Sequence, residues 1–144
     1  MGKFLNHVAK FAGETVRMKR TEKEAQKIDP QTKQKLDNLI AKAEDGDVKA
    51  MDTLATFYYQ GKYVGYNPTE ACRWWTEAAT KGHVDAQYNL GLFYMGNLST
   101  YVATDENKAG YWLDMAARNG DKEAADLLHR RFKIGFTGKW KLKN

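Results

Sequence analysis

The chain has 144 residues, of which 42% are apolar and 28% charged, and its formal net charge is +5. These values are typical of a small globular domain, and no apolar run approaches the roughly 18 residues that a membrane-spanning helix needs. Because the single cysteine, Cys72, cannot form an internal disulfide and the first residues lack an apolar secretion signal, we expect a cytoplasmic protein.

The positive charge is concentrated at the two ends of the chain. Residues 1–28 hold seven Lys or Arg and three Glu, whereas residues 29–128 hold ten basic and fifteen acidic side chains. Residues 129–144 hold six basic side chains and no acidic one. Basic ends of this kind could bind nucleic acid. The basic residues are not interleaved with aromatic stacking groups at a readable spacing, which argues against nucleic acid as the partner.

Residues 1–28 are expected to form an N-terminal amphipathic helix followed by a basic linker. Apolar side chains recur at offsets of three and four in the first half, at Phe4, Leu5, Val8 and Phe11. Such a segment can lie on anionic lipid, so a membrane-surface or nucleic-acid adaptor that acts through the basic termini is one alternative function. The helix could instead cover an apolar face of the following domain, in the same chain or in a second copy, so the oligomeric state stays open.

Residues 29–135 are predicted to form a helical repeat domain that begins with a capping helix. Asp29 and Pro30 predict an N-cap followed by the first helical residue, and Gly46 predicts the end of this helix. Its apolar face consists of Leu36, Leu39, Ile40 and Ala43.

Two sequence patterns then alternate, which indicates a repeat. The pattern A-x-x-W-x-x-x-A-A-x-x-G starts at Ala71 and returns 38 positions later, at Ala109. A second pattern, with Leu and an aromatic residue at fixed offsets, starts at Ala50, Ala86 and Ala124. Offsets of three, seven and eight share a helical face, and a period of about 20–50 residues is typical of stacked helical units. Helices with the second pattern are called A helices below, and those with the first B helices.

The end of the chain is predicted to close the array. A third A helix is expected over residues 121–134, and residues 136–144 should form a basic tail in which Phe136 and Trp140 fold back onto that helix. Residues 30–135 should therefore contain about six helices, each antiparallel to the next, and no strand.

No pattern in the sequence indicates catalysis. The three histidines lie in separate predicted elements, and neither a His-x-x-x-His nor a Cys-x-x-Cys pair is present. A G-x-S-x-G motif and a glycine-rich phosphate loop are also missing. We therefore expect a non-enzymatic protein without catalytic residues, metal ligands or a cofactor.

Over roughly residues 47–135 the two patterns resemble those of the Sel-one-like repeat family, whose members are related to tetratricopeptide repeats. Family A helices carry L-G-x-x-Y-x-x-G, from which the first copy departs at Ala55 and the second at Gly96. The resemblance implies an all-α fold, a short α-solenoid of antiparallel helix pairs in a tetratricopeptide-like superhelix. It also implies a protein-protein interaction module, with bacterial members that include cytoplasmic adaptors, scaffolds and toxin-neutralising proteins.

The resemblance further implies that the A helices line a concave face that binds another protein or a peptide. The corresponding partner-binding residues would be Asp52, Thr56, Tyr59, Asp85, Tyr88, Leu92, Met95 and Arg130. The apolar ones among them could form a contact patch for the partner, since such patches usually mark interaction sites. They could equally well touch another part of the same chain.

Overall fold

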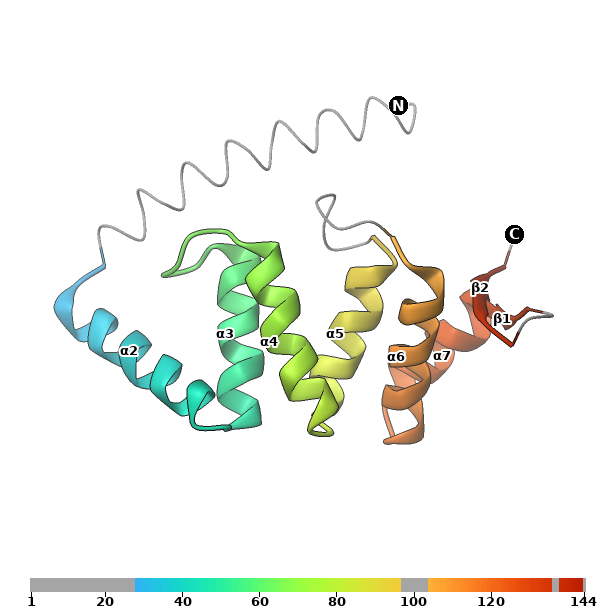
Figure 1. The fold of residues 1–144 in the computed structure, drawn as a ribbon, viewed down its shortest axis with the longest axis horizontal. Coiled ribbons are helices and arrows are strands. Elements are labelled where there is room, and N and C mark those ends of the chain that lie inside the picture. Colours follow the sequence, from blue (N-terminus) through green and yellow to red (C-terminus); the bar gives the residue numbers. More distant parts are fainter. Residues whose placement is uncertain (1–27, 97–103, 136–137, 144) are drawn as a thin grey trace, which may run out of the picture. The chain divides into compact units, whose positions relative to one another are not determined.

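The computed structural model describes residues 28–96, 104–135 and 138–143, so the predicted amphipathic face at Phe4, Leu5, Val8 and Phe11 lies outside the described residues. The described residues contain six helices, α2 to α7, and a two-stranded hairpin (Figure 1). The chain divides into two compact units, residues 1–74 and 75–144, with the boundary inside α4 (Pro68–Thr80).

The described part of the first unit consists of α2 (Pro30–Glu44), α3 (Val48–Gln60) and the first half of α4. The Asp29 side chain caps α2 by accepting the Thr32 N–H at 3.0 Å, as predicted. Hydrogen bonds from the Thr32 hydroxyl and N–H hold the pKa of Asp29 below its ordinary value. The buried side chains are Leu36, Ala43, Ala50, Met51, Leu54, Ala55, Tyr66, Ala71 and Trp74.

The connection from an A helix to its B helix is closed in the same way in both repeats. The Asn67 N–H donates to the Tyr58 carbonyl at 2.9 Å, and the Asp105 N–H donates to the Tyr94 carbonyl at 2.9 Å. The side chains of Asn67 and Asp105 then accept backbone N–H groups in the first turn of the B helix, at 3.1 and 2.9 Å. The loop between these junctions can therefore change length without disturbing the helix pair.

The second unit contains α5 (Val84–Tyr94), α6 (Glu106–Arg118) and α7 (Lys122–Arg131), which alternate in direction (Figure 1). Gly82 and Gly120 close the two copies of the B-helix pattern, and their φ angles of +90° and +97° lie in the left-handed region that glycine favours. The core that joins α6 to α7 is built from Ala109, Leu113, Ala116, Ala124 and Phe132.

The end of the chain differs from the prediction. Helix α7 stops at Arg131, and β1 (Phe132–Ile134) pairs antiparallel with β2 (Trp140–Leu142), so the expectation of no strand in residues 30–135 is wrong. The physical reason is a change of period: apolar side chains alternate with lysines in both segments, and glycines lie between them. Such alternation favours a hairpin over a further helical turn.

Trp140 also docks one helix earlier than expected, on α6. A Cβ atom at Gly110 of α6 would lie only 2.2 Å from Trp140 Cβ, so the indole rests on a helix surface without a side chain. The outer edge of β2 is held by the same helix, because Trp140 N–H donates to Asn107 Oδ1 at 3.0 Å and Leu142 N–H to Glu106 Oε2 at 3.2 Å. Phe136, the other residue expected to fold back, lies outside the described residues.

Candidate interaction surfaces

In the first unit, the predicted partner-binding residues Asp52, Thr56 and Tyr59 lie on one side of α3, because their spacing of four and three residues follows the helical turn. All three side chains are half-buried. The Thr56 hydroxyl donates to the Asp52 carbonyl at 2.9 Å, and the Tyr59 ring lies 6.4 Å from the Tyr66 ring. These contacts therefore restrict the conformations that the side chains of Thr56 and Tyr59 can adopt.

In the second unit, Asp85, Tyr88, Leu92 and Met95 come from α5 and its C-cap. Asp85 is exposed, while the other three are half-buried. Tyr88 and Met95 pack against the buried core of this unit, so they already touch their own chain. Part of each of these two side chains is therefore used in packing within the chain, and the remaining part is accessible to solvent.

The structure brings Tyr88 close to charged residues of the next A helix, α7. Burial raises the pKa of the Tyr88 hydroxyl, the carboxylates of Glu123 and Asp121 raise it further, and Arg130 opposes them. Arg130 is exposed and its Nε donates to the Asp126 carbonyl at 3.3 Å. We define the A-helix face of the second unit as the surface formed by Asp85, Tyr88, Leu92, Met95, Glu123 and Arg130.

One buried polar residue was not predicted as important from the sequence. Gln87 of α5 is only 1% exposed, yet both ends of its amide are hydrogen-bonded. Its Nε2 donates to the Ala79 carbonyl at 3.1 Å, and its Oε1 accepts from Asn119 Nδ2 at 2.9 Å. Gln87 therefore joins the C-terminal ends of two successive B helices. The first repeat has Met51 at this position, so the repeat pattern carries no signal for the bridge.

A pocket of about 380 Å³ lies at the end of the array, between α6, α7 and the hairpin. We call it the terminal pocket. Its apolar lining consists of Ala117, Ala125, Leu128, Phe132, Ile134 and Trp140. Three polar residues complete it: His129, Lys133 and Lys143. Sequence reasoning missed this pocket because it treated residues 132–134 as helix, although the alternation of apolar and lysine residues could have revealed the strands.

The hairpin next to the terminal pocket is strongly basic. Lys133 and Lys141 are directly opposite each other in the antiparallel pair, and both are exposed. Within the part of the chain that the structure describes, neither of them nor Lys143 forms an ion pair with a carboxylate. Like charges directly opposite each other repel, so this cross-strand pair of lysines is unfavourable.

A second pocket, of about 340 Å³, lies in the first unit between α2 and α3. Its aromatic wall is formed by Phe57 and Tyr63, whose rings meet edge to face at 5.2 Å. Leu36 and Leu39 of α2 face them across the pocket. Lys62 Nζ lies 5.1 Å from the Tyr63 ring centre, which keeps this wall in place through a cation–π contact.

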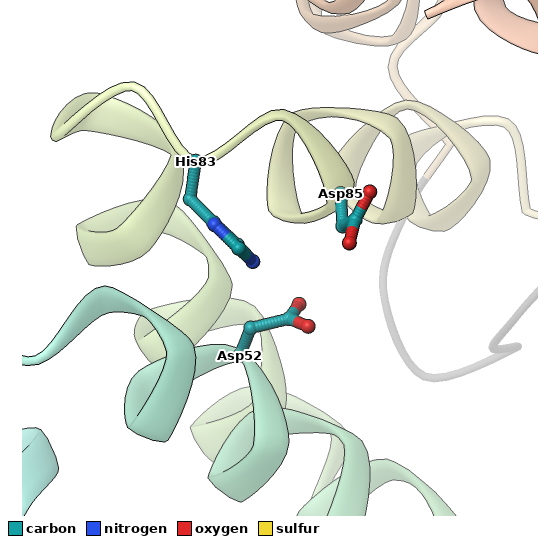
Figure 2. A group of neighbouring side chains, drawn as sticks. All are labelled: Asp52, His83 and Asp85. Atoms are coloured by element: carbon teal, nitrogen blue, oxygen red, sulfur yellow. The ribbon is translucent and has the colours of Figure 1, made fainter.

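His83 and Asp85 stand at the start of α5, where Figure 2 draws them together with Asp52. Imidazole and carboxylate groups are common zinc ligands, but structural and catalytic zinc sites use at least three protein ligands. The second unit supplies only two of these residues, because Asp52 belongs to α3 in the first unit. We therefore assign no metal site to them.

None of the helices in the described residues combines the length and the apolar character that crossing a membrane requires.

Comparison with known proteins identifies the repeats. The family model for the Sel1 repeat matches residues 48–83 and 84–121, which contain the helix pairs α3/α4 and α5/α6. Among curated proteins, the uncharacterized protein YibG of Escherichia coli K12 is 30% identical over 106 residues. That alignment covers 72% of this chain and 66% of YibG, so the chain spans slightly less than two thirds of this relative.

Two solved structures share the fold. A Sel1 repeat protein from Oxalobacter formigenes has a TM-score of 0.60 and 34% identity, over 67% of this chain and 71% of that one. The protein c5321, a protective antigen of uropathogenic Escherichia coli strains that displays an SLR fold, has a TM-score of 0.60 and 36% identity. In that case the match covers 65% of this chain but only 20% of c5321.

Proposed function

This chain belongs to the Sel1 repeat family, and we propose that it is a non-enzymatic adaptor that binds another protein through the A-helix face. Membership of the family and the all-α, tetratricopeptide-like solenoid fold both agree with the sequence-based prediction, apart from the terminal hairpin. Sel1 repeat proteins are generally protein-interaction modules and typically scaffolds without catalytic activity. The use of this face by this chain is the part that we propose.

The observation that carries the proposal is the position of Tyr88 on α5 beside Glu123 and Arg130 on α7. A half-buried tyrosine is already ordered by its packing, so little side-chain entropy is lost when its exposed edge meets a partner. The carboxylate of Glu123 and the guanidinium of Arg130, which both influence the ionisation of Tyr88, offer a partner an acceptor and a donor. Aromatic residues and arginine are also the residue types that dominate the energy of protein interfaces.

Site-specific photo-crosslinking in the cell that produces the protein tests this proposal. A photoreactive amino acid at Leu92 should capture one main partner, which mass spectrometry identifies. The same amino acid at Tyr111, which is 51% exposed on the B helix α6, is the matched control and should not capture it. Equal capture of that partner at both positions would contradict binding through the A-helix face.

The identified partner then allows a quantitative test with purified proteins. Arg130→Glu reverses an exposed charge beside Tyr88 and should raise the Kd by roughly tenfold, because a partner group paired with the guanidinium would face repulsion. Tyr111→Ala should leave the Kd unchanged. Circular dichroism of both variants checks that the helices are retained.

A further inference from the structure

The terminal pocket lies where an additional B helix would pack if the repeat continued. Small side chains of α6 and α7, Ala117 and Ala125, face the pocket, and Leu128 contributes the larger apolar surface. The hairpin forms the remaining wall through Phe132, Ile134 and Trp140. Ile134 is 64% exposed, so the hairpin covers this end of the array only in part. The pocket volume of about 380 Å³ is sufficient for one or two apolar side chains.

The charges around the pocket select the chemistry of its occupant. Lys133 and Lys143 line it, and Lys141 is directly opposite Lys133 on the neighbouring strand. Lys143 Nζ donates to the His129 carbonyl at the end of α7, which fixes one ammonium group beside the pocket. Since residues 129–144 contain no acidic side chain, an occupant that brings carboxylates would relieve the repulsion between these lysines.

Two occupants from the same protein are disfavoured by charge. The N-terminal segment, residues 1–28, holds seven basic and three acidic side chains and would be repelled by the hairpin. A second copy docked through the same surface would place two basic hairpins against each other, which a symmetric dimer interface requires.

Nucleic acid and lipid fit the pocket less well than a protein segment does. Single-stranded nucleic acid needs open aromatic faces, whereas the Trp140 ring system is packed on Gly110 of α6. A lipid bilayer presents a broad, nearly flat surface, whereas this site is a small apolar hollow with lysines beside it.

We propose that the terminal pocket binds an acidic amphipathic helix of a partner protein, in the place that a further B helix of the array would occupy. Leucine-like side chains of the partner enter the pocket, and its flanking carboxylates pair with Lys133 and Lys143. This surface is separate from the A-helix face, so the proposal does not depend on the function proposed above.

A synthetic peptide provides the probe. It has about 15 residues, with leucines spaced three and four apart and glutamates on either side of them, and it carries a fluorescent label. Fluorescence anisotropy with the full chain should show saturable binding, and the peptide should shift the NMR signal of the Trp140 indole N–H. A peptide with lysines in place of the glutamates should not bind.

Variants of the protein separate the pocket from general charge effects. Lys133→Glu combined with Lys143→Glu should raise the Kd by at least about tenfold. The control Lys33→Glu with Lys49→Glu makes the same charge change at exposed lysines of α2 and α3 that do not line the terminal pocket, so it should have a smaller effect. Ala125→Leu, which fills the pocket without altering charge, should also weaken binding. Ala41→Leu, at an exposed alanine of α2, should not.

Three results would overturn the proposal. The first is an absence of peptide binding at millimolar concentration. The second is equal weakening by the control variants of the first unit, which would show only non-specific attraction. The third is tighter binding of duplex DNA, or of vesicles containing phosphatidylglycerol, than of the acidic peptide, because either ligand would then be the better fit to the basic hairpin. Circular dichroism and urea unfolding confirm that each variant is folded before binding is measured.

Discussion

Gly110 on α6 and Trp140 on β2 are in such close contact that a Cβ atom at position 110 would lie 2.2 Å from Trp140 Cβ and 2.3 Å from its Cγ. These atoms belong to the base of the indole side chain, which cannot move away without displacing β2. The first repeat has Cys72 at the position that corresponds to Gly110. Because Gly110 has no side chain where the first repeat has Cys72, the surface of α6 is open at this point and the hairpin can pack on it.

Gly110→Ala is expected to detach the hairpin from α6. Overpacking of this kind typically costs about 1–3 kcal/mol, although the higher helix propensity of alanine offsets part of the cost. Urea unfolding measures the loss of stability, and the NMR signal of the Trp140 indole reports whether the ring leaves its site. A double-mutant cycle supplies the control, because Gly110→Ala should cost much less when Trp140 is already alanine. An unchanged cost in that background would show that Trp140 does not rest on Gly110.

Gly91→Leu should destabilise the second unit for a similar reason. A Cβ atom at Gly91 would lie 2.5 Å from Leu113 Cγ, and Leu113 is fully buried, so even the first added carbon forces the two helices apart. The expected cost is about 1–3 kcal/mol or more, measured by urea unfolding. Arg118→Ala is the control. Arg118 forms an ion pair with Asp114 at 2.7 Å, but its side chain is 75% exposed. Because exposed ion pairs contribute at most about 1 kcal/mol, this variant should lose little stability. A Gly91→Leu protein as stable as the parent would mean that α5 and α6 are not this close.

The sequence allowed prediction of those features that depend on local patterns. Helix ends were predictable because Asp29, Asp105, Gly82 and Gly120 satisfy capping groups or adopt left-handed backbone angles on their own. The close contact at Gly91 is also predictable from the repeat, because small residues at fixed offsets on a helix allow a second helix to approach closely.

The features that were missed depend on partners far along the chain. The packing contact between Gly110 and Trp140 joins residues 30 positions apart, and the hydrogen bond between Gln87 and Asn119 joins residues 32 positions apart. Neither pair follows the helical period, so the pattern of one element alone does not reveal it. The charged surroundings of Tyr88 likewise come from α7, a different helix from its own.

Gln87→Met tests the buried bridge between the two B-helix ends. Methionine is similar in volume to glutamine and stands at the corresponding position of the first repeat, where Met51 is 2% exposed. The substitution leaves the Ala79 carbonyl and the Asn119 amide without this partner, so we expect a loss of about 1–3 kcal/mol in urea unfolding. Asn119→Ala breaks only one of the two hydrogen bonds and should cost less. If Gln87→Met increases stability, apolar packing at this site outweighs the bridge.

The stability of the fold should depend on the ionisation of Tyr88 at high pH. Burial, followed by Glu123 and Asp121, raises the pKa of Tyr88 above its ordinary value of 10.0. The folded state therefore holds the phenolic proton more tightly than the unfolded state, so this contribution is complete below about pH 10 and is lost as the pH rises through the raised pKa. Urea unfolding between about pH 9 and about pH 11 should show stability falling less steeply in Tyr88→Phe than in the parent.

One further substitution, Glu123→Gln, identifies the cause of this pH dependence. Glu123→Gln removes the larger of the two charge effects and should move the absorbance titration of Tyr88 toward lower pH. Tyr58 must be considered in the same titration, because burial and Glu70 raise its pKa as well. A Tyr88→Phe protein with the same pH dependence as the parent would assign the whole effect to other groups.

For the cross-strand pair of Lys133 and Lys141, we predict that one substitution increases the stability of the protein and weakens its binding of the acidic peptide. Lys141→Glu replaces a repulsive pair with an attractive one across the hairpin, and cross-strand pairs of this type contribute roughly 0.2–1 kcal/mol. The variant should therefore be slightly more stable than the parent in urea at low salt. Added salt screens both interactions, so it should stabilise the parent and narrow the difference between the two proteins. Lys141→Gln removes the repulsion without adding attraction, so its stability should lie between those of the parent and Lys141→Glu.

The same Lys141→Glu protein should bind the acidic peptide more weakly, because it places a carboxylate beside the terminal pocket. Lower stability of Lys141→Glu at low salt would show that the two lysines do not face each other in this register, and a gain in stability with unchanged peptide affinity would place the acidic ligand elsewhere.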